Sequence, residues 1–307
     1  MRFTRVPVFL AAGAIALTAT ATMLAVPAAA GADPLGPAAA GHAAVYHKPV
    51  PGDLYYVADG YIMRVPVSGG AAKRVVWVGD VSITGMAIAD DRLFWVTLTG
   101  ADDSLSYVGL KGAAHAHTLV AGLAFPVGLV AADGWLYWAD ENAIGRVRPN
   151  GTKLSRQFIK LAQETGGGVA DGLATDGHHL FFSRCQNDEI GRVGFGGDGV
   201  SFIKLPRASC PQGLAVGGDE LYWAEVGGYV GRATLQGTHI TGKWLNIHTS
   251  QGPFSVAADQ DDVYWDWGGV AGSPFHIGRA QVNRSGFHSS ILRGQGAFLL
   301  TSPGASS

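Results

Sequence analysis

The chain has 307 residues, which is enough for one large β domain or two ordinary domains. Its 22 basic and 24 acidic residues nearly balance, which argues against a nucleic-acid-binding protein, because such proteins usually carry a basic face. Gly is abundant, with 45 residues, as expected where many tight turns join short strands.

The N-terminal segment has the features of an export signal. Two Arg residues precede an apolar run over residues 6–26, and small residues around Ala30 and Ala32 suit a signal peptidase. We therefore predict a signal peptide over residues 1–32, cleaved after Ala30 or Ala32, and a secreted, extracellular protein with no membrane span after cleavage. The alternative is a retained membrane anchor, because the apolar run is just long enough to cross a bilayer.

Residues 33–51 contain Pro and small residues without periodicity and are predicted to be a flexible leader. A single repeating domain follows over residues 52–303, and residues 304–307 form a short polar tail.

Within that domain, a Leu or Val followed by two aromatic residues returns at intervals of roughly 39 to 44 residues, which is the period of a propeller blade. The six copies are Leu54-Tyr55-Tyr56, Leu93-Phe94-Trp95, Leu136-Tyr137-Trp138, Leu180-Phe181-Phe182, Leu221-Tyr222-Trp223 and Val263-Tyr264-Trp265. The repeat predicts an all-β fold, a six-bladed β-propeller of four-stranded antiparallel blades. We expect the second aromatic of each copy to fill the space between neighbouring sheets.

The third repeat shows most clearly which residues form the four strands of one blade. Its strands, named A to D in chain order, are expected over residues 126–133, 135–140, 144–148 and 154–160, with Asn150-Gly151 as the hairpin turn between C and D. A Gly marks this turn in every repeat, at Gly70, Gly112, Gly151, Gly199, Gly237 and Gly286.

Two polar positions also recur in register, which favours structural roles over one shared site. An Asp at the end of strand A should close the A–B turn on its own backbone; it occurs as Asp90, Asp133, Asp176 and Asp259. An Arg on strand C should pair with carbonyls or carboxylates; it occurs as Arg64, Arg146, Arg192, Arg232 and Arg279.

The domain begins on a strand B, at Leu54, and ends on a strand A, over residues 296–301. Pairing these two segments would close the ring and remove the exposed sheet edges of an open array. We therefore predict that the C-terminal strand A completes the N-terminal blade.

The only two cysteines are expected to form a disulfide. Cys185 ends strand B of the fourth blade, and Cys210 precedes strand A of the fifth. Antiparallel strand order places both on the same face of the ring, and export brings the chain to an oxidising compartment.

The third repeat resembles a known family. Leu136-Tyr137-Trp138-Ala139-Asp140, followed by Ile144-Gly145-Arg146, looks like the YWTD repeat of low-density-lipoprotein-receptor class B propellers, and is similar to NHL repeats and to those of virginiamycin B lyase. The YWTD resemblance implies an extracellular binding module. The lyase resemblance implies a seven-bladed enzyme with a metal and a catalytic His, whereas six blades are counted here and no catalytic residue can be placed.

A ligand site is expected at the channel mouth, where the repeats differ from one another. The residues predicted there come from the ends of strands B and the starts of strands A: Asp140, Asp171, Arg184, Gln212, Glu225 and Trp267. Their mixture of charged, amide and aromatic groups suits a polar small molecule, a glycan, a peptide or a protein.

Two functions are consistent with this sequence. The first is a secreted, monomeric binding or scaffold module without catalytic activity. The second is a metal-dependent hydrolase or lyase, resembling either the propeller lactonases or virginiamycin B lyase. Asp140, Asp171 and Glu225 would offer hard oxygen ligands for Ca²⁺. His115 and His117 could supply two zinc ligands, but two are too few, and we interpret them as a surface pair.

Overall fold

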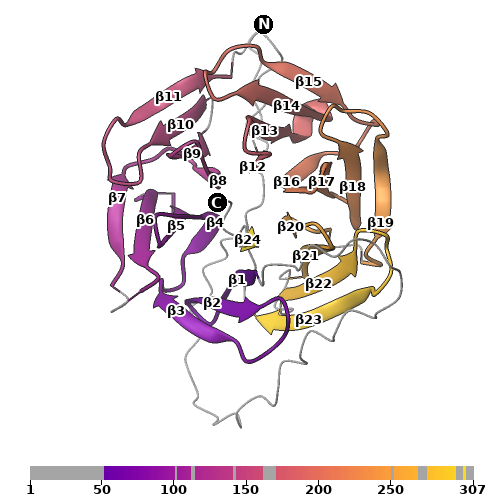
Figure 1. The fold of residues 1–307 in the computed structure, drawn as a ribbon, viewed down its shortest axis with the longest axis horizontal. Helices are drawn as coiled ribbons and strands as arrows, with labels where there is room; N and C mark the ends of the chain where they lie inside the picture. The colour runs from indigo at the N-terminus through magenta and orange to yellow at the C-terminus, as the bar shows by residue number, and fades with distance from the viewer. Residues whose placement is uncertain are drawn as a thin grey trace, which may run out of the picture. The chain divides into compact units, whose positions relative to one another are not determined.

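A computed structural model describes residues 52–100, 102–111, 115–140, 143–161, 171–249, 252–268, 275–294 and 300–301. These residues form six sheets of four strands each, arranged in a ring (Figure 1). The predicted six-bladed propeller is therefore confirmed. The expected signal peptide, leader and tail lie outside the described residues.

In blades two to six the strands follow the chain from the centre of the ring outward, and in blade one the last strand of the chain, β24, takes the innermost place. Blades one to three consist of β24 (Leu300–Thr301), β1 (Asp53–Ala58), β2 (Tyr61–Pro66) and β3 (Lys73–Trp77); β4 (Ser82–Ala89), β5 (Arg92–Leu98), β6 (Ser104–Gly109) and β7 (His117–Ala121); and β8 (Val127–Ala132), β9 (Trp135–Asp140), β10 (Ala143–Val147) and β11 (Ser155–Lys160).

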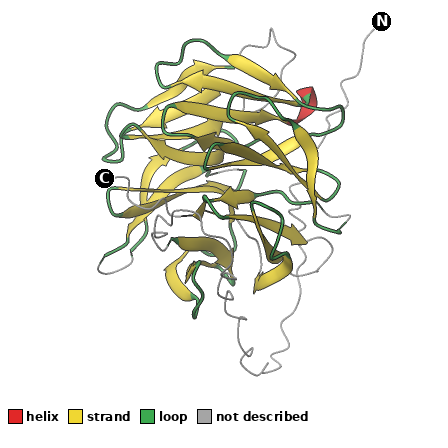
Figure 2. Cartoon of the chain, turned by 45° about the vertical axis from the view of Figure 1, so that its right-hand side comes forward, coloured by secondary structure: helices red, strands yellow, loops and turns green. Residues whose placement is uncertain are grey.

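Blades four to six repeat this order. They consist of β12 (Leu173–Thr175), β13 (His179–Arg184), β14 (Glu189–Gly194) and β15 (Ser201–Lys204); β16 (Pro211–Gly217), β17 (Glu220–Glu225), β18 (Tyr229–Thr234) and β19 (Thr241–Asn246); and β20 (Val256–Ala258), β21 (Asp262–Gly268), β22 (Phe275–Gln281) and β23 (His288–Gly294). A short 3-10 helix at Cys185–Asn187 interrupts the otherwise all-strand pattern (Figure 2).

The ring closes as the sequence predicts. β24, near the end of the chain, pairs antiparallel with β1, with Leu54 opposite Thr301 and Tyr55 opposite Leu300. The first blade thus receives its innermost strand from the C-terminal end of the chain.

The core lies in the seams between blades. Each hydrophobic cluster of the described residues joins two neighbouring sheets; for example, Trp138 of blade three packs with Phe94 and Leu105 of blade two. Trp138, Trp223 and Trp265 are fully buried. The expectation that these aromatics fill the space between sheets is confirmed.

A glycine on strand C lies directly beneath the second aromatic of strand B. The two are register partners in four blades, as Trp138–Gly145, Phe182–Gly191, Trp223–Gly231 and Trp265–Gly278. A Cβ on any of these glycines would overlap the aromatic ring. The Ile-Gly-Arg segment of the repeat therefore gives the ring a flat backbone surface to pack on.

The innermost strands also approach one another through glycine. A Cβ on Gly172 of blade four would come 2.7 Å from Gln212 O of blade five, and one on Gly213 would come 2.8 Å from Phe254 O of blade six. Any larger residue at these points would push neighbouring blades apart.

The recurring polar residues have mostly the predicted roles. Asp259 Oδ1 accepts hydrogen bonds from the backbone N–H groups of Asp261 and Asp262, at 2.9 and 2.8 Å, and Asp176 closes its turn in the same way. Asp90 and Asp133 instead occupy left-handed turn positions, with φ of 48° and 50°.

Four of the five strand C arginines pair with carboxylates or a carbonyl, as predicted, whereas Arg192 Nη2 lies against the His179 ring. Arg279 Nη2 lies 2.8 Å from Asp262 Oδ2, and Arg64 Nη1 lies 3.5 Å from Asp53 Oδ2. Arg146 donates to Phe195 O at 3.5 Å, between neighbouring blades.

The C–D turns need one correction. Gly151 and Gly237 occupy the hydrogen-bonded turn position that the sequence predicts. In blades one and four this position belongs to Gly69 and Gly197, and in blade six it belongs to Arg284 instead of Gly286. Counting from the aromatic motif cannot fix the turn register, because the B–C connections differ in length. Counting from the strand C Arg does fix it, since the closing residue lies five positions after that Arg in each of these five blades. Gly112 lies outside the described residues.

We expect Gly231→Ala to destabilise the protein, because the new methyl group would overlap the Trp223 ring. Overpacking of this kind costs about 2 kcal/mol, which should appear as a lower Tm in thermal unfolding. Gly194→Ala is the matched control, since a Cβ there would meet no atom within 4 Å. Equal Tm values for the two variants would contradict the proposed packing role.

Deletion of the residues after Gly294 should also lower Tm, because β1 would lose its pairing with β24 and expose a sheet edge. Thermal unfolding of the shortened protein measures this directly. A shortened protein as stable as the full chain would show that the closure contributes nothing.

Candidate functional site

The ends of strands B and the starts of strands A meet on one face of the ring, which we call the channel-mouth face. The register shows this directly: Pro211 at the start of β16 lies opposite Glu225 at the end of β17. The residue before each inner glycine lies on this face, at the centre of the ring. In blades two to five these residues are Thr84, Val127, Asp171 and Gln212, and Phe254 holds the equivalent place in blade six, before Ser255.

Hydrogen bonds between consecutive blades fix the backbone around this centre. Thr84 Oγ1 donates to Pro126 O at 2.7 Å, and Ser183 Oγ donates to Gln212 O at 2.5 Å. The N–H of Gly213 donates to Phe254 O at 3.0 Å. The channel-mouth positions are therefore held to their neighbours and not presented on long loops.

Asp171 and Gln212 come together on this face, in neighbouring blades. Asp171 Oδ2 accepts a hydrogen bond from the N–H of Cys185 at 2.9 Å. Burial raises the pKa of the Asp171 carboxyl to about 6, and the Cys185 amide acts in the opposite direction.

The predicted disulfide is confirmed, and it joins the loops beside these two residues. Cys185 and Cys210 are bonded, with their Cα atoms 3.8 Å apart. Asp188 accepts hydrogen bonds from the N–H groups of Ala208 and Cys210, at 2.8 and 2.9 Å. Gln212 Nε2 lies 3.4 Å from Cys210 Sγ. Blades four and five are thus tied together both covalently and by hydrogen bonds.

Arg184 does not face the channel mouth. Its side chain is 2% exposed, and Nη1 lies 2.7 Å from Glu189 Oε1. Glu189 also pairs with Lys204 on the outermost strand. Arg184 is therefore the inner end of a row of charges across blade four.

Glu225 points into the seam between blades four and five. Its side chain is buried, and Oε2 accepts a hydrogen bond from Trp223 Nε1 at 3.3 Å. Burial raises the pKa of Glu225 to about 7, opposed by the Trp223 hydrogen bond and by Lys243. Asp140 occupies the equivalent place in blade three and is also buried.

Trp267 lies over the outer strands of its own blade. Its ring stacks on His276, with centroids 4.3 Å apart, and Nε1 donates to Ser289 O at 2.5 Å. Of the predicted site residues, the structure thus brings Asp171 and Gln212 together, whereas Asp140, Arg184, Glu225 and Trp267 are directed into seams or along blades.

Two further carboxylates on this face are not among the six predicted site residues. Asp266 is 1% exposed, and its Oδ1 accepts from the N–H groups of Phe254 and Ser255, at 2.9 and 2.8 Å. Burial raises its pKa to about 7. Asp103 holds the N–H groups of Thr99 and Gly100. The sequence places Asp266 at the end of a strand B, where Ala139 and Ala224 stand in other repeats, although it is not among the six predicted site residues.

Within the described ranges, no three His, Cys, Asp or Glu side chains are grouped so that they could hold a metal ion. His117 stacks on Tyr107, with centroids 5.3 Å apart, and both His115 and His117 are exposed. The helical structure found in the described part of the chain is too short to cross a bilayer.

No family model matches the sequence, and no curated protein matches it either. Solved structures of similar fold do match. The nidogen/laminin complex contains a chain with 17% identity and a TM-score of 0.66, over 81% of this chain and 98% of that one. The chain has the fold of a YWTD propeller.

Lyases of similar fold also match. Virginiamycin B lyase from Staphylococcus aureus has 22% identity and a TM-score of 0.53, over 83% of this chain and 85% of that one. A streptogramin B lyase has 20% identity and a TM-score of 0.56, over 83% and 81%. The resemblance to YWTD and NHL-like propellers is thus confirmed for the fold, which does not by itself determine function.

The raised carboxyl pKa values predict a pH-dependent stability. The folded-state pKa of Glu225, about 7, exceeds the value of about 4.3 for an unfolded chain. The folded state therefore binds more protons between these values, and the free energy of unfolding should fall as pH rises from about 4 to about 7. The raised pKa values of Asp266 and Asp171 also lower the free energy of unfolding as pH rises.

Glu225→Gln should raise Tm at pH 8 and reduce the loss of Tm between pH 5.5 and pH 8, because it removes the ionisation and keeps an acceptor for Trp223. Thermal unfolding at both pH values measures the effect. Asp198→Asn, at an exposed carboxyl, is the control. A pH dependence unchanged in Glu225→Gln would show that Glu225 ionises normally.

Proposed function

We propose that this protein is a secreted binding module that recognises a peptide segment of a partner protein on the channel-mouth face. The disulfide between Cys185 and Cys210 is compatible with an extracellular protein. The site is built from the central polar positions, Asp171 and Gln212, and from exposed apolar side chains on the same face.

The observation that carries this proposal is the conformation of Phe125. This residue, in the loop entering blade three, is 56% exposed and has a φ of 51°. A bulky residue in the left-handed region costs on the order of 1 kcal/mol or more, and such strain is concentrated at functional sites. Burial of the ring does not offset this cost, since the ring faces solvent.

A buried carboxylate, Asp103, stabilises the strained conformation of Phe125. The N–H of Phe125 donates to Asp103 Oδ2 at 3.3 Å, while Asp103 Oδ1 accepts from Thr99 and Gly100. Asp103 is buried. The backbone of Phe125 is therefore held in one conformation, which lowers the entropic cost of binding through this loop.

Two more exposed apolar residues lie on this face. Phe254 is 45% exposed in the loop entering blade six, and its N–H is held by Asp266. Val226 is 52% exposed, directly after β17 of the neighbouring blade. Aromatic groups beside amides and carboxylates are the composition expected where a peptide docks, because its side chains need apolar contacts and its backbone needs polar ones. The nidogen/laminin complex supports the proposal by analogy, as a structure of similar fold solved with a protein partner.

A metal-dependent hydrolase or lyase is the alternative function. The observation that favours it is Asp171, a half-buried carboxyl with a raised pKa beside Gln212 at the centre of the ring. Metal analysis of the purified protein, followed by a thermal-shift screen with Ca²⁺ and Zn²⁺, distinguishes it: a bound metal lost in Asp171→Asn would favour the enzyme.

The binding proposal is tested by selecting peptides from a random library displayed on phage against the immobilised full secreted chain. The double variant Phe125→Asn with Phe254→Ser removes both rings, and Asn tolerates the left-handed conformation. We expect selected peptides to bind this variant about tenfold or more weakly, as for interface hot spots.

Leu154→Ser is the control for this experiment, because Leu154 is 45% exposed beside a C–D turn on the opposite face. Peptides that bind the double variant as tightly as the unchanged protein would contradict the proposal. So would a selection that enriches no peptide.

A further inference from the structure

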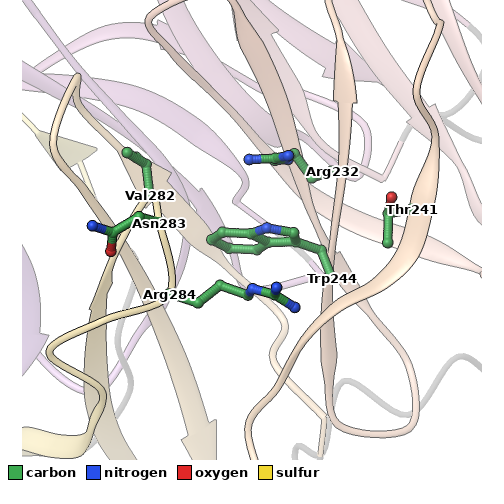
Figure 3. A pocket seen from close by; sticks show the side chains of 6 residues that line it. All are labelled: Arg232, Thr241, Trp244, Val282, Asn283 and Arg284. Carbon is green, nitrogen blue, oxygen red and sulfur yellow. The ribbon is translucent and has the colours of Figure 1, made fainter.

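A groove of about 350 Å³ lies between the outer strands of blade five and the C–D turn of blade six. Figure 3 shows the indole of Trp244 between the side chains of two arginines, Arg232 and Arg284. The other lining residues are Thr241, Val282 and Asn283. None of the six is acidic. The groove is at the end of the blades that carries the C–D turns, away from the channel-mouth face.

Arg284 breaks the pattern of the repeat. In four other blades the residue whose N–H closes the C–D turn is a glycine with positive φ: Gly69, Gly151, Gly197 and Gly237. In blade six the N–H of Arg284 closes the turn onto Gln281 O at 2.7 Å, and Arg284 has a φ of 70°. An arginine therefore adopts a backbone conformation that glycine adopts without strain.

The same turn has a second left-handed position, and here the exchange is reversed. Lys153 and His239 occupy it in blades three and five, whereas blade four has Gly199 and blade six has Gly286. Compared with blades three and five, the large side chain of blade six is at the first turn position instead of the second. At that position Arg284 lines the groove, where it makes no side-chain hydrogen bond or ion pair within the described ranges.

Arg232 supplies the second cation. Its guanidinium lies over the Trp244 ring, 5.4 Å from the centroid. Its Nε is 3.7 Å from Glu220 Oε2, too far for a hydrogen bond, and has no hydrogen-bond partner in the part of the chain described. The lining thus holds two guanidinium groups and no carboxylate, while Glu220 and the Tyr222 hydroxyl lie beside Arg232.

Neutral polar groups complete the lining. Asn283 Oδ1 accepts the N–H of Ser285 at 2.8 Å, which orients its side chain and leaves the amide N–H groups to donate. The Thr241 hydroxyl is exposed. The volume is within the range of about 300–1,000 Å³ for small-molecule sites and is larger than a bare inorganic anion needs.

We propose that this groove binds an acidic sugar unit, with its carboxylate held by Arg232 and Arg284 and its hydroxyl groups by Asn283 and Thr241. Planar guanidinium groups match a carboxylate with paired hydrogen bonds. This proposal is independent of the function proposed for the channel-mouth face, because it uses other residues in another place.

Titration of the full secreted chain with glucuronate, followed by calorimetry or by the NMR signal of the Trp244 indole N–H, tests the proposal. We expect saturable binding of glucuronate that weakens as salt is added, and no binding of glucose. Glucose 6-phosphate and inorganic sulfate are titrated in the same way, to compare a phosphorylated sugar and a bare anion with the sugar carboxylate. Tighter binding of either one than of glucuronate would overturn the assignment to a sugar carboxylate.

Arg284→Gly should weaken glucuronate binding about tenfold or more, as expected for loss of a charge-assisted contact. Its Tm should be equal or higher, because glycine suits the left-handed position. The double variant Arg284→Gly with Gly286→Arg keeps the net charge but moves the arginine to the other turn position. We expect it to bind as weakly as the single variant. Unchanged affinity in either variant would overturn the proposal, as would equal binding of glucose and glucuronate.

Discussion

The packing of an aromatic ring onto the glycine of the neighbouring strand determines the geometry of four of the six blades. Trp138, Trp223 and Trp265 each lie on a strand C glycine, where a Cβ would overlap the ring. Because the ring lies flat against its own sheet, its other face is free to pack on the preceding blade. One contact thus sets both the structure within a sheet and the spacing between sheets. Blades one and two depart from it, with Tyr56 opposite Met63 and Trp95 opposite Ser106.

A second use of glycine follows at the centre of the ring. Gly172 and Gly213 let consecutive inner strands touch backbone to backbone, and hydrogen bonds such as that from Ser183 Oγ to Gln212 O join the blades there. The aromatic–glycine packing and the contacts between inner strands recur around the ring, so the residues that repeat from blade to blade already have structural roles. Any recognition chemistry must then come from positions where the blades differ.

This division explains how much could be predicted from the sequence. The blade count, the ring closure and the disulfide depend on a short repeat and on strand order, both of which are visible in the chain. The orientation of Glu225 was accessible too: it lies two residues after Trp223, so strand alternation places both side chains on the same side, in the seam. The prediction that Glu225 lines the channel mouth did not take this alternation of side chains into account. The position of Phe125 was not accessible, because no pattern shows a positive φ at a Phe.

The same reasoning connects the two proposed sites, which share no residue. Most left-handed residues outside glycine in this protein are Asp or other residues with small or polar side chains, such as Asp59, Asp90 and Asp133, for which the conformation is common in turns. Phe125 and Arg284 also adopt it with large exposed side chains, as do Lys153 and His239, but only Phe125 is apolar and only Arg284 stands at the turn position that glycine holds in four other blades. The fold does not require either choice: other blades enter strand A without such a residue and close the C–D turn with glycine. Strain that the architecture does not need is the feature that both proposals use, with an apolar peptide group proposed at Phe125 and an anion at Arg284.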